Sequence, residues 1–291
     1  MIDAVATLLQ RLEVPAVRYT YCHLSLQGCG LAARDFRPLL DLLAAHLPGT
    51  TLVVPSFPFG GNAEYAEILK AKPVRYDVQR TPCRVNLFGE LFRRAAGVHR
   101  SFHPLLPVTA LGPSARDLVA GAHEDPMPFG PGTAFDTILR EKGCVLGLGV
   151  DANTNSFSHF PDEACFERYP FPIYSDRPLP CRVFDGGRPL FSKDYYYFTV
   201  ALRRRIRPGR FHELMKGQTF YRFADGDVRA YVLELEPFVR YASRHAEQAV
   251  AAGRLPVWHE EPDQLAGHRA GTQAVADRLT TPCVNGGIES I

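Results

Sequence analysis

The chain has 291 residues, 46% of them hydrophobic, and a formal net charge of +2. It can therefore bury the core of one globular domain, and its charge balance does not indicate a nucleic acid or an anionic membrane as a partner. The sequence has neither an apolar run as long as a membrane span nor the pattern of a signal peptide. We therefore expect a cytoplasmic protein.

The first part of the chain predicts a β-α-β unit. Apolar residues at helical spacing indicate a helix over 2–13. An aromatic and β-branched stretch over 17–26 then predicts a strand that runs into a glycine turn. A second helix is expected over 36–47 and a second strand within 50–57. Two strands joined through a helix are typical of an α/β sheet.

The middle and end of the chain predict further elements of the same sheet. Residues 60–82 are polar and irregular, which indicates a long and often functional loop with one short helix at 63–71. We expect helices over 85–95, 114–120 and 237–251, and strands over 108–111, 144–150, 180–184, 195–202 and 228–235. The fold class is therefore α/β, with one domain over 1–252 and a mixed sheet between helical layers. Residues 253–291 are mostly polar, contain Trp258, and predict a C-terminal appendage.

Several separated stretches form an ordered set of motifs, although none is specific by itself. They are Leu24–Gly28, Leu52–Phe57, Arg100–Pro104 with Ala110–Pro113, Phe129–Thr133 after Asp125-Pro126, Asn155–Glu163 after Gly147–Val150, and Asp225–Ala230. Together, over about residues 18–245, they resemble the motifs of the aminoglycoside 3-N-acetyltransferase family. The sequence departs from the family at Tyr21, Leu106 and Asp162, where the family has histidine, histidine and glutamate.

The resemblance implies an acyltransferase that moves an acyl group from acetyl-CoA to the amine of a small molecule. Matching motif residues implies contacts with coenzyme A for Ser25, Gly28, Ser56, Arg100, His103 and Ser156, and contacts with the acceptor for Glu90 and Phe129. Two of these assignments have a structural alternative: Gly28 could serve only a tight turn, and His103 could only shape the pocket. A homodimer is left open as well.

The Asn155–Glu163 motif contains the residues suited to the chemistry. Transfer of an acyl group from a thioester to an amine requires a group that removes a proton from the amine. His159 suits this task because an imidazole accepts a proton near neutral pH, and a nearby carboxylate fixes its tautomer. In a helical turn, Asp162 and Glu163 both lie on the same face as His159. The sequence leaves open which acid orients the imidazole, and whether the grouping arises by chance.

The acceptor is the least determined part of this interpretation. Known members of the family take polycationic aminoglycosides, whose pocket should gather carboxylates. Residues 161–194 instead carry acids and bases in nearly equal number, and the arginine-rich run 203–210 follows. This favours a mono-amine or a phosphate-bearing amino sugar, with an aminoglycoside resistance enzyme as the alternative. The run 203–210 could grip phosphates or form a solvated face.

Other mechanisms and classes stay open. Cys22 or Cys144 could form an acyl-enzyme, but no companion histidine motif accompanies either residue. The seven cysteines show no CxxC pair and no zinc-ligand spacing, so we expect reduced thiols and no metal site. A binding protein that kept the fold and lost the chemistry, or a thioester hydrolase, would fit the same motifs.

Overall fold

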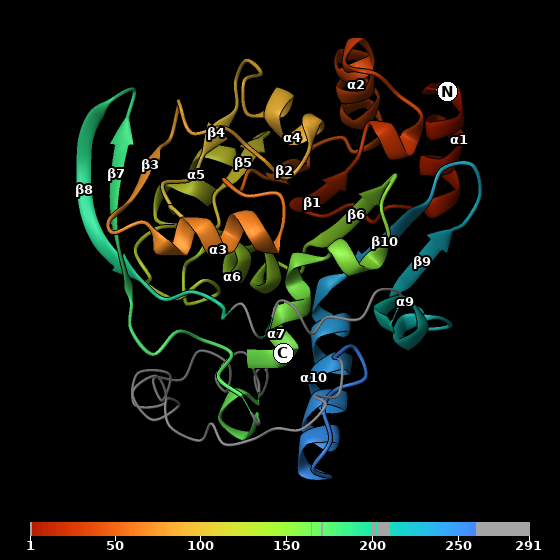
Figure 1. The fold of residues 1–291 in the computed structure, drawn as a ribbon. Helices are drawn as coiled ribbons and strands as arrows, with labels where there is room; N and C mark the ends of the chain where they lie inside the picture. Colours follow the sequence, from red (N-terminus) through yellow and green to blue (C-terminus); the bar gives the residue numbers. More distant parts are fainter. Residues whose placement is uncertain (1, 164, 170, 200–201, 203–209, 260–291) are drawn as a thin grey trace.

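The computed structural model describes residues 2–163, 165–169, 171–199, 202 and 210–259 (Figure 1). A seven-stranded sheet has the order β4-β5-β2-β1-β6-β10-β9, and β3, β7 and β8 form a second sheet. The strands are β1 (Tyr19–Leu24), β2 (Thr51–Pro55), β3 (Val74–Asp77), β4 (His99–Arg100), β5 (Val108–Leu111), β6 (Cys144–Leu148), β7 (Leu179–Asp185), β8 (Arg188–Tyr195), β9 (Tyr221–Ala224) and β10 (Ala230–Glu234). The helices are α1 (Ile2–Leu12), α2 (Phe36–His46), α3 (Asn62–Lys70), α4 (Leu87–Phe92), α5 (Ala115–Ala120), α6 (Ala134–Arg140), α7 (Phe160–Glu163), α9 (Arg210–Met215) and α10 (Leu235–Ala251).

The middle of the large sheet is parallel. β1 pairs in parallel with both β2 and β6, and α2 connects β1 to β2, as the predicted β-α-β unit requires. β5 and β10 flank these strands in antiparallel orientation. Because β1, β2 and β6 run in the same direction, the loops after Leu24, Pro55 and Leu148 leave the sheet at one edge. This is the edge where open α/β sheets usually bind ligands.

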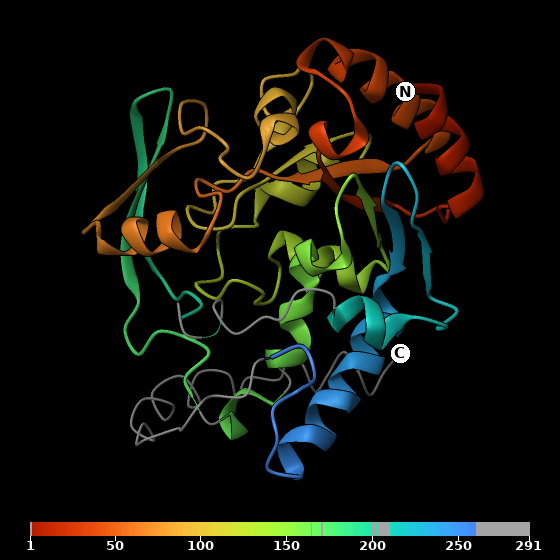
Figure 2. The same ribbon diagram turned by 45° about the vertical axis from the view of Figure 1, so that its right-hand side comes forward.

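Each face of the large sheet is covered by its own helices. Tyr21 packs in a core with α5, α6 and α10, whereas the next residue on β1, Cys22, packs with α1, α2 and α4. Figure 2 shows α1 and α2 on one side of the sheet and α10 on the other. This alternation of buried side chains produces the layered α/β architecture that the sequence predicts. No helix in the described ranges is long and apolar enough to cross a membrane.

The turn after β1 lies directly against the end of β6. The Ser25 N–H donates to the Leu148 carbonyl at 2.9 Å, and a Cβ on Gly28 would lie 1.9 Å from the Gly149 oxygen. Gly149 itself has a φ of +67°, a left-handed conformation that favours glycine. Glycine at these two positions therefore lets the two loops touch.

Several stretches differ from the sequence-based prediction, and β4, β8, β9 and α9 were not predicted at all. The predicted loop over 60–82 contains β3, because Val74 and Tyr76 are buried while the segment pairs with β7. The prediction of a strand over 195–202 is wrong for its described residues, since β8 ends at Tyr195 and only an isolated bridge at Phe198 follows. The sequence pattern also did not predict α6, which the Thr133 hydroxyl caps.

The beginning of the predicted C-terminal appendage enters the core. Leu255, Trp258 and His259 are buried, and Trp258 is fully enclosed. A tryptophan has a large apolar surface, so its burial outweighs the polar character of the neighbouring sequence. The domain boundary at 253 stays a prediction, because residues 260–291 lie outside the described residues. Residues 203–209 of the arginine-rich run lie outside them as well.

Candidate active site

A cavity of about 430 Å³ lies at the edge of the sheet where β1, β2 and β6 end. Its apolar wall includes Phe129, Phe135 and Phe198. Its polar lining consists of His23, Ser25, Asn62, Asn86, Asn153, Thr154, Asn155, Ser156, Ser158 and His159. None of the described lining residues is an Asp, Glu, Lys or Arg. The cavity therefore offers ligands an apolar surface, neutral hydrogen-bonding groups and imidazole.

His159 faces this cavity from a short 3-10 helix, Ser156–His159, that follows β6. The helix begins there because the Asn155 side-chain oxygen accepts the Phe157 N–H at 3.1 Å. The imidazole stacks on Phe198 with ring centroids 4.4 Å apart, and its side chain is 13% exposed. His159 is therefore held in a fixed orientation at the cavity wall.

Asp162 lies behind His159 on α7, and its two oxygens have different partners. Oδ2 is 3.5 Å from Nδ1 of His159. Oδ1 is bonded to the Tyr169 hydroxyl at 2.6 Å, Trp258 Nε1 at 3.0 Å and His259 Nε2 at 2.8 Å. Burial opposes ionisation of this carboxyl, but His259 and His159 outweigh it and hold its pKa well below the usual range. The carboxylate is therefore placed to accept a hydrogen bond from the Nδ1–H of His159.

Glu163 follows Asp162 directly but is in a different electrostatic state. Burial raises its pKa well above the usual range, and the negative charges of Asp162 and Asp125 add to this effect. Its Oε1 has no hydrogen-bond partner among the described residues. Asp162, whose Oδ2 contacts Nδ1 of His159, is therefore the better candidate for the acid that orients this imidazole.

Ser156 contacts His23, a cavity residue that the sequence reasoning missed. His23, on β1, lines the cavity, and its Nε2 accepts the Ser156 N–H at 3.3 Å. The Ser156 Oγ lies 3.4 Å from the same nitrogen and accepts from the Tyr21 hydroxyl at 3.4 Å. Burial lowers the pKa of His23 to about 3, so the ring is neutral at neutral pH. Its place near the carboxyl end of a parallel strand was the signal that could have identified His23.

Ser25 and Phe129 also line the cavity, whereas Gly28 packs against Gly149. The Ser25 hydroxyl oxygen accepts the Gly28 N–H at 3.1 Å, which shapes the turn between them. Phe129 lies 6.2 Å from His159, measured between ring centroids. Close packing of two loops accounts for Gly28, while contacts of Ser25 and Phe129 with ligands stay predictions.

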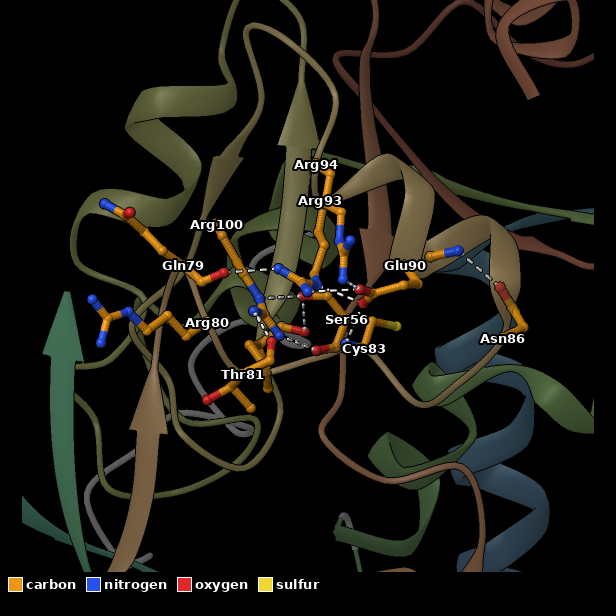
Figure 3. Close-up of polar contacts among 12 residues, drawn as sticks. Ser56, Gln79, Arg80, Thr81, Cys83, Asn86, Glu90, Arg93, Arg94 and Arg100 are labelled. Carbon is orange, nitrogen blue, oxygen red and sulfur yellow. Dashed lines mark hydrogen bonds and ion pairs between the residues drawn. The ribbon is translucent and has the colours of Figure 1, made fainter. Parts of the chain in front are cut away.

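Ser56 and Arg100 belong to an internal polar network outside the cavity lining (Figure 3). Arg100 donates from Nε to the Ser56 hydroxyl at 3.1 Å and from Nη2 to the Ser56 carbonyl at 2.7 Å. Its Nη1 donates to the carbonyls of Val78 and Thr81 at 3.1 and 2.6 Å. Burial lowers the pKa of this guanidinium. These bonds tie the loop after β3 to the end of β2, and we call the four residues the Arg100 network.

Glu90 adjoins this network on α4 (Figure 3). Its carboxylate accepts from Arg93 at 2.5 and 2.6 Å, pairs with Arg94, and accepts the Cys83 N–H at 2.7 Å. Burial opposes ionisation here too, but these partners lower the pKa of Glu90. Glu90 is not in the cavity lining, whereas the nearby Asn86 is. Its contacts support a role in fixing this part of the wall.

His103 is buried and caps a turn. Its Nδ1 accepts the N–H groups of Leu105 at 3.3 Å and Leu106 at 3.0 Å. Burial, with the charges of His123 and Lys193, lowers the pKa of His103 to about 3. Leu106 lines the cavity, so the contacts of His103 favour the structural alternative.

The donors to Asp162 are the second set of residues that the sequence reasoning missed. Tyr169 follows α7, while Trp258 and His259 follow α10. Tryptophan and histidine next to each other in an otherwise polar segment were the available signal, because such residues are seldom left exposed. Among the described residues, no group of three His, Cys, Asp or Glu could hold a metal ion.

An α/β sheet whose parallel strands end at a cavity with a histidine-carboxylate pair is typical of enzymes that transfer protons to or from a bound substrate. Residues 22–245 match the aminoglycoside 3-N-acetyltransferase family, and the chain belongs to this family of acyltransferase enzymes. The family and the enzyme class that the motifs predict are thereby confirmed.

Similar proteins are known in sequence and in structure. The chain is 27% identical over 182 residues to aminoglycoside N(3)-acetyltransferase IX of Micromonospora chalcea, a match that spans 58% of this chain and 64% of that enzyme. AAC-IIIb, solved as a binary complex with CoASH, has the same fold, with a TM-score of 0.67, 17% identity, and coverage of 85% of this chain and 96% of that one. A variant of aminoglycoside acetyltransferase AAC(3)-IVa in complex with a gentamicin has a TM-score of 0.63, 20% identity, and coverage of 88% and 94%. The predicted fold class is confirmed.

Proposed function

We propose that the chain transfers an acyl group from acetyl-CoA directly to the amine of a small molecule such as an amino sugar, with His159 as the general base. The observation that supports this most is the place of His159 at the cavity wall, with Asp162 Oδ2 behind its Nδ1 at 3.5 Å. Family membership supports the reaction class, because the family is named for N-acetyl transfer.

His159 and Asp162 have different roles in this reaction. Asp162 accepts a hydrogen bond from the Nδ1–H of His159 and stays ionised, which leaves Nε2 as the base. The imidazole removes a proton from the acceptor nitrogen as that nitrogen attacks the thioester carbonyl. The new C–N bond forms, the C–S bond breaks, and the departing thiolate takes up the proton. The Asp162–His159 distance is long for a hydrogen bond, and such contacts commonly tighten once substrate is bound.

The cavity supports acetyl-CoA as the acyl donor through its uncharged amide groups. Nδ2 of buried Asn155 has no hydrogen-bond partner among the described residues, and neither do Oδ1 and Nδ2 of Asn153. Buried amides without partners are costly unless a ligand or water satisfies them. Both residues line the cavity. Their amides, with the Ser25 and Ser156 hydroxyls, would bind the amide and carbonyl groups of the donor's pantetheine arm.

The wall composition supports an acceptor with few positive charges. A polycation requires carboxylates to offset the loss of water around each ammonium group, and the described lining residues supply none. An aminoglycoside is the second candidate. It is favoured by the similarity to the Micromonospora chalcea enzyme and by the gentamicin complex of the AAC(3)-IVa variant.

Direct transfer is also supported by the surroundings of the cysteines. The six described cysteines are free and buried, and none is in the cavity lining. Burial raises the pKa of Cys144 to about 12, which disfavours the nucleophilic thiolate. Free thiols fit a reducing compartment such as the cytoplasm. A homodimer stays a hypothesis.

Incubation with acetyl-CoA and a panel of amines tests this function, with free thiol and acylated product measured by mass spectrometry. An amide product is expected. Hydrolysis alone would indicate a thioesterase, and neither product would indicate a binding protein. Comparing kcat/KM for a mono-amine sugar and a polycationic aminoglycoside at two salt concentrations tests the acceptor class. A strong, salt-sensitive preference for the polycation would favour the second candidate.

A further inference from the structure

Two of the groups bonded to Asp162 come from beyond the residues that match the family. The match ends at residue 245, whereas Trp258 and His259 follow α10. Figure 2 shows the chain turning back after α10 towards α7, the helix that contains Asp162. The acid behind His159 is therefore held by residues 96 and 97 positions away in sequence.

Trp258 anchors this returning segment. Its side chain is fully enclosed, stacks on Phe211 of α9 at 5.0 Å between centroids, and packs 5.7 Å from His245 of α10. A buried indole N–H requires an acceptor, and Asp162 Oδ1 supplies it at 3.0 Å. This packing fixes the position of the next residue, His259.

His259 makes the shorter of the two histidine contacts with Asp162. Its side chain is fully buried, its ring lies edge-on to Tyr169 at 5.7 Å, and its Nε2 is 2.8 Å from Oδ1. A buried carboxylate is stable only when donors surround it. With Tyr169, Trp258 and His259 on Oδ1, Oδ2 is the oxygen that faces His159.

We propose that His259 is a positioning residue of the active site: it acts through Asp162 and holds this carboxylate as an anion whose Oδ2 faces His159. The packing of Trp258 holds His259 beside Asp162. The proposal rests on the proposed function in assigning His159 as the base. It makes Trp258 and His259 part of the shell that positions the catalytic pair, although both lie outside the family match.

Three matched variants isolate this role. His259→Phe keeps an aromatic ring of similar size and removes the donor. His259→Gln offers an amide donor at nearly the reach of the imidazole Nε2. His245→Phe is the control, because it replaces another histidine that packs on Trp258.

We expect His259→Phe to lower kcat by about tenfold, a usual effect of losing a partner that orients a site residue, with KM for acetyl-CoA within about twofold of wild type. His259→Gln should recover most of the loss, and His245→Phe should keep the wild-type kcat. In an Asp162→Asn background, His259→Phe should cause no further loss, because it acts only through the carboxylate. An equal loss in both backgrounds, or a wild-type kcat in His259→Phe, would overturn the proposal.

A measurement without turnover separates this proposal from the proposed function. The imidazole ¹⁵N chemical shifts of His159 at neutral pH report its contact with Asp162. We expect them to change in His259→Phe and to stay unchanged in His245→Phe. If no amine is ever acylated, the proposed function fails while this comparison still decides the positioning role. Unchanged His159 shifts in a folded His259→Phe protein would rule it out.

Discussion

The cavity wall around His159 and the Arg100 network both contain family motif residues, yet they differ in whether their polar atoms have hydrogen-bond partners. At the wall, Asn155 and Asn153 have amide atoms without hydrogen-bond partners among the described residues. In the network, all three nitrogens of the Arg100 guanidinium donate to hydroxyl or carbonyl oxygens of the protein. A buried polar group without a partner beside a cavity can be satisfied by a ligand or by water, whereas the bonds of the Arg100 guanidinium already hold the backbone. The set of family motifs therefore contains both residues that line the cavity and residues that fix the backbone, and their hydrogen bonds distinguish the two kinds.

The largest effect is expected at the cavity wall. His159→Ala should lower the acyl-transfer rate by about 10² to 10⁴-fold, the contribution of a positioned general base, while acetyl-CoA still binds. Steady-state kinetics with a fold check by circular dichroism measures this. A rate within about threefold of wild type would falsify the assignment of the base.

Behind the wall, the two adjacent acids should differ. Asp162→Asn should lower kcat by about 10²-fold because the amide can no longer stabilise the imidazolium, whereas Glu163→Gln should leave kcat within about threefold. The pair serves as its own control, since both substitutions replace a carboxylate by an amide of the same size. Greater loss in Glu163→Gln would transfer the orienting role to that residue.

The Arg100 network should affect stability rather than rate. Arg100→Met should lower the free energy of unfolding by about 3 kcal/mol, because the carbonyls of Ser56, Val78 and Thr81 lose their donor. Denaturant unfolding measures this, and kcat and KM should stay near wild type. A raised KM for acetyl-CoA in a stably folded variant would instead support the predicted contact of Arg100 with coenzyme A.

Acid should destabilise the protein through its buried neutral histidines. The pKa of His103 is about 3 in the fold, below the ordinary 6.5, so its contribution is complete above pH 6.5 and is lost as pH falls towards 3. His103→Asn keeps an acceptor for the Leu106 N–H and removes the titration. Between pH 7 and 5, unfolding free energies should therefore fall by about 2 kcal/mol less in His103→Asn than in wild type. Equal slopes would contradict the burial argument.

The smallest effect is expected at the buried thiols. Cys22→Ser and Cys144→Ser should not abolish transfer, and intact mass should show no acylated protein when acetyl-CoA is supplied without acceptor. Ping-pong kinetics with an acyl-cysteine adduct would replace the direct mechanism by a covalent one.

The sequence by itself determined the α/β class, the opening β-α-β unit and the family. These follow from local patterns: apolar spacing identifies the helix before β1, β-branched runs identify β1 and β2, and short motifs keep their order along the chain. His159 was predicted as a site residue because its motif follows a buried strand directly, and it lines the cavity. The predicted strand over 195–202 failed because Phe198 lines the cavity, where it stacks on His159, and makes only an isolated bridge with Tyr174.

Only the tertiary structure decided which motif residues line the cavity and placed Asp162 Oδ2 3.5 Å from Nδ1 of His159. It separated Ser156 from Arg100, although both lie in family motifs, and it brought His23 to the same wall. It also brought Trp258 and His259 to Asp162 across 96 and 97 residues. Local periodicity does not encode such contacts, because they depend on how α10 and the segment after it pack against α7. The ionisation of a buried carboxylate is set by the donors that this packing places around it.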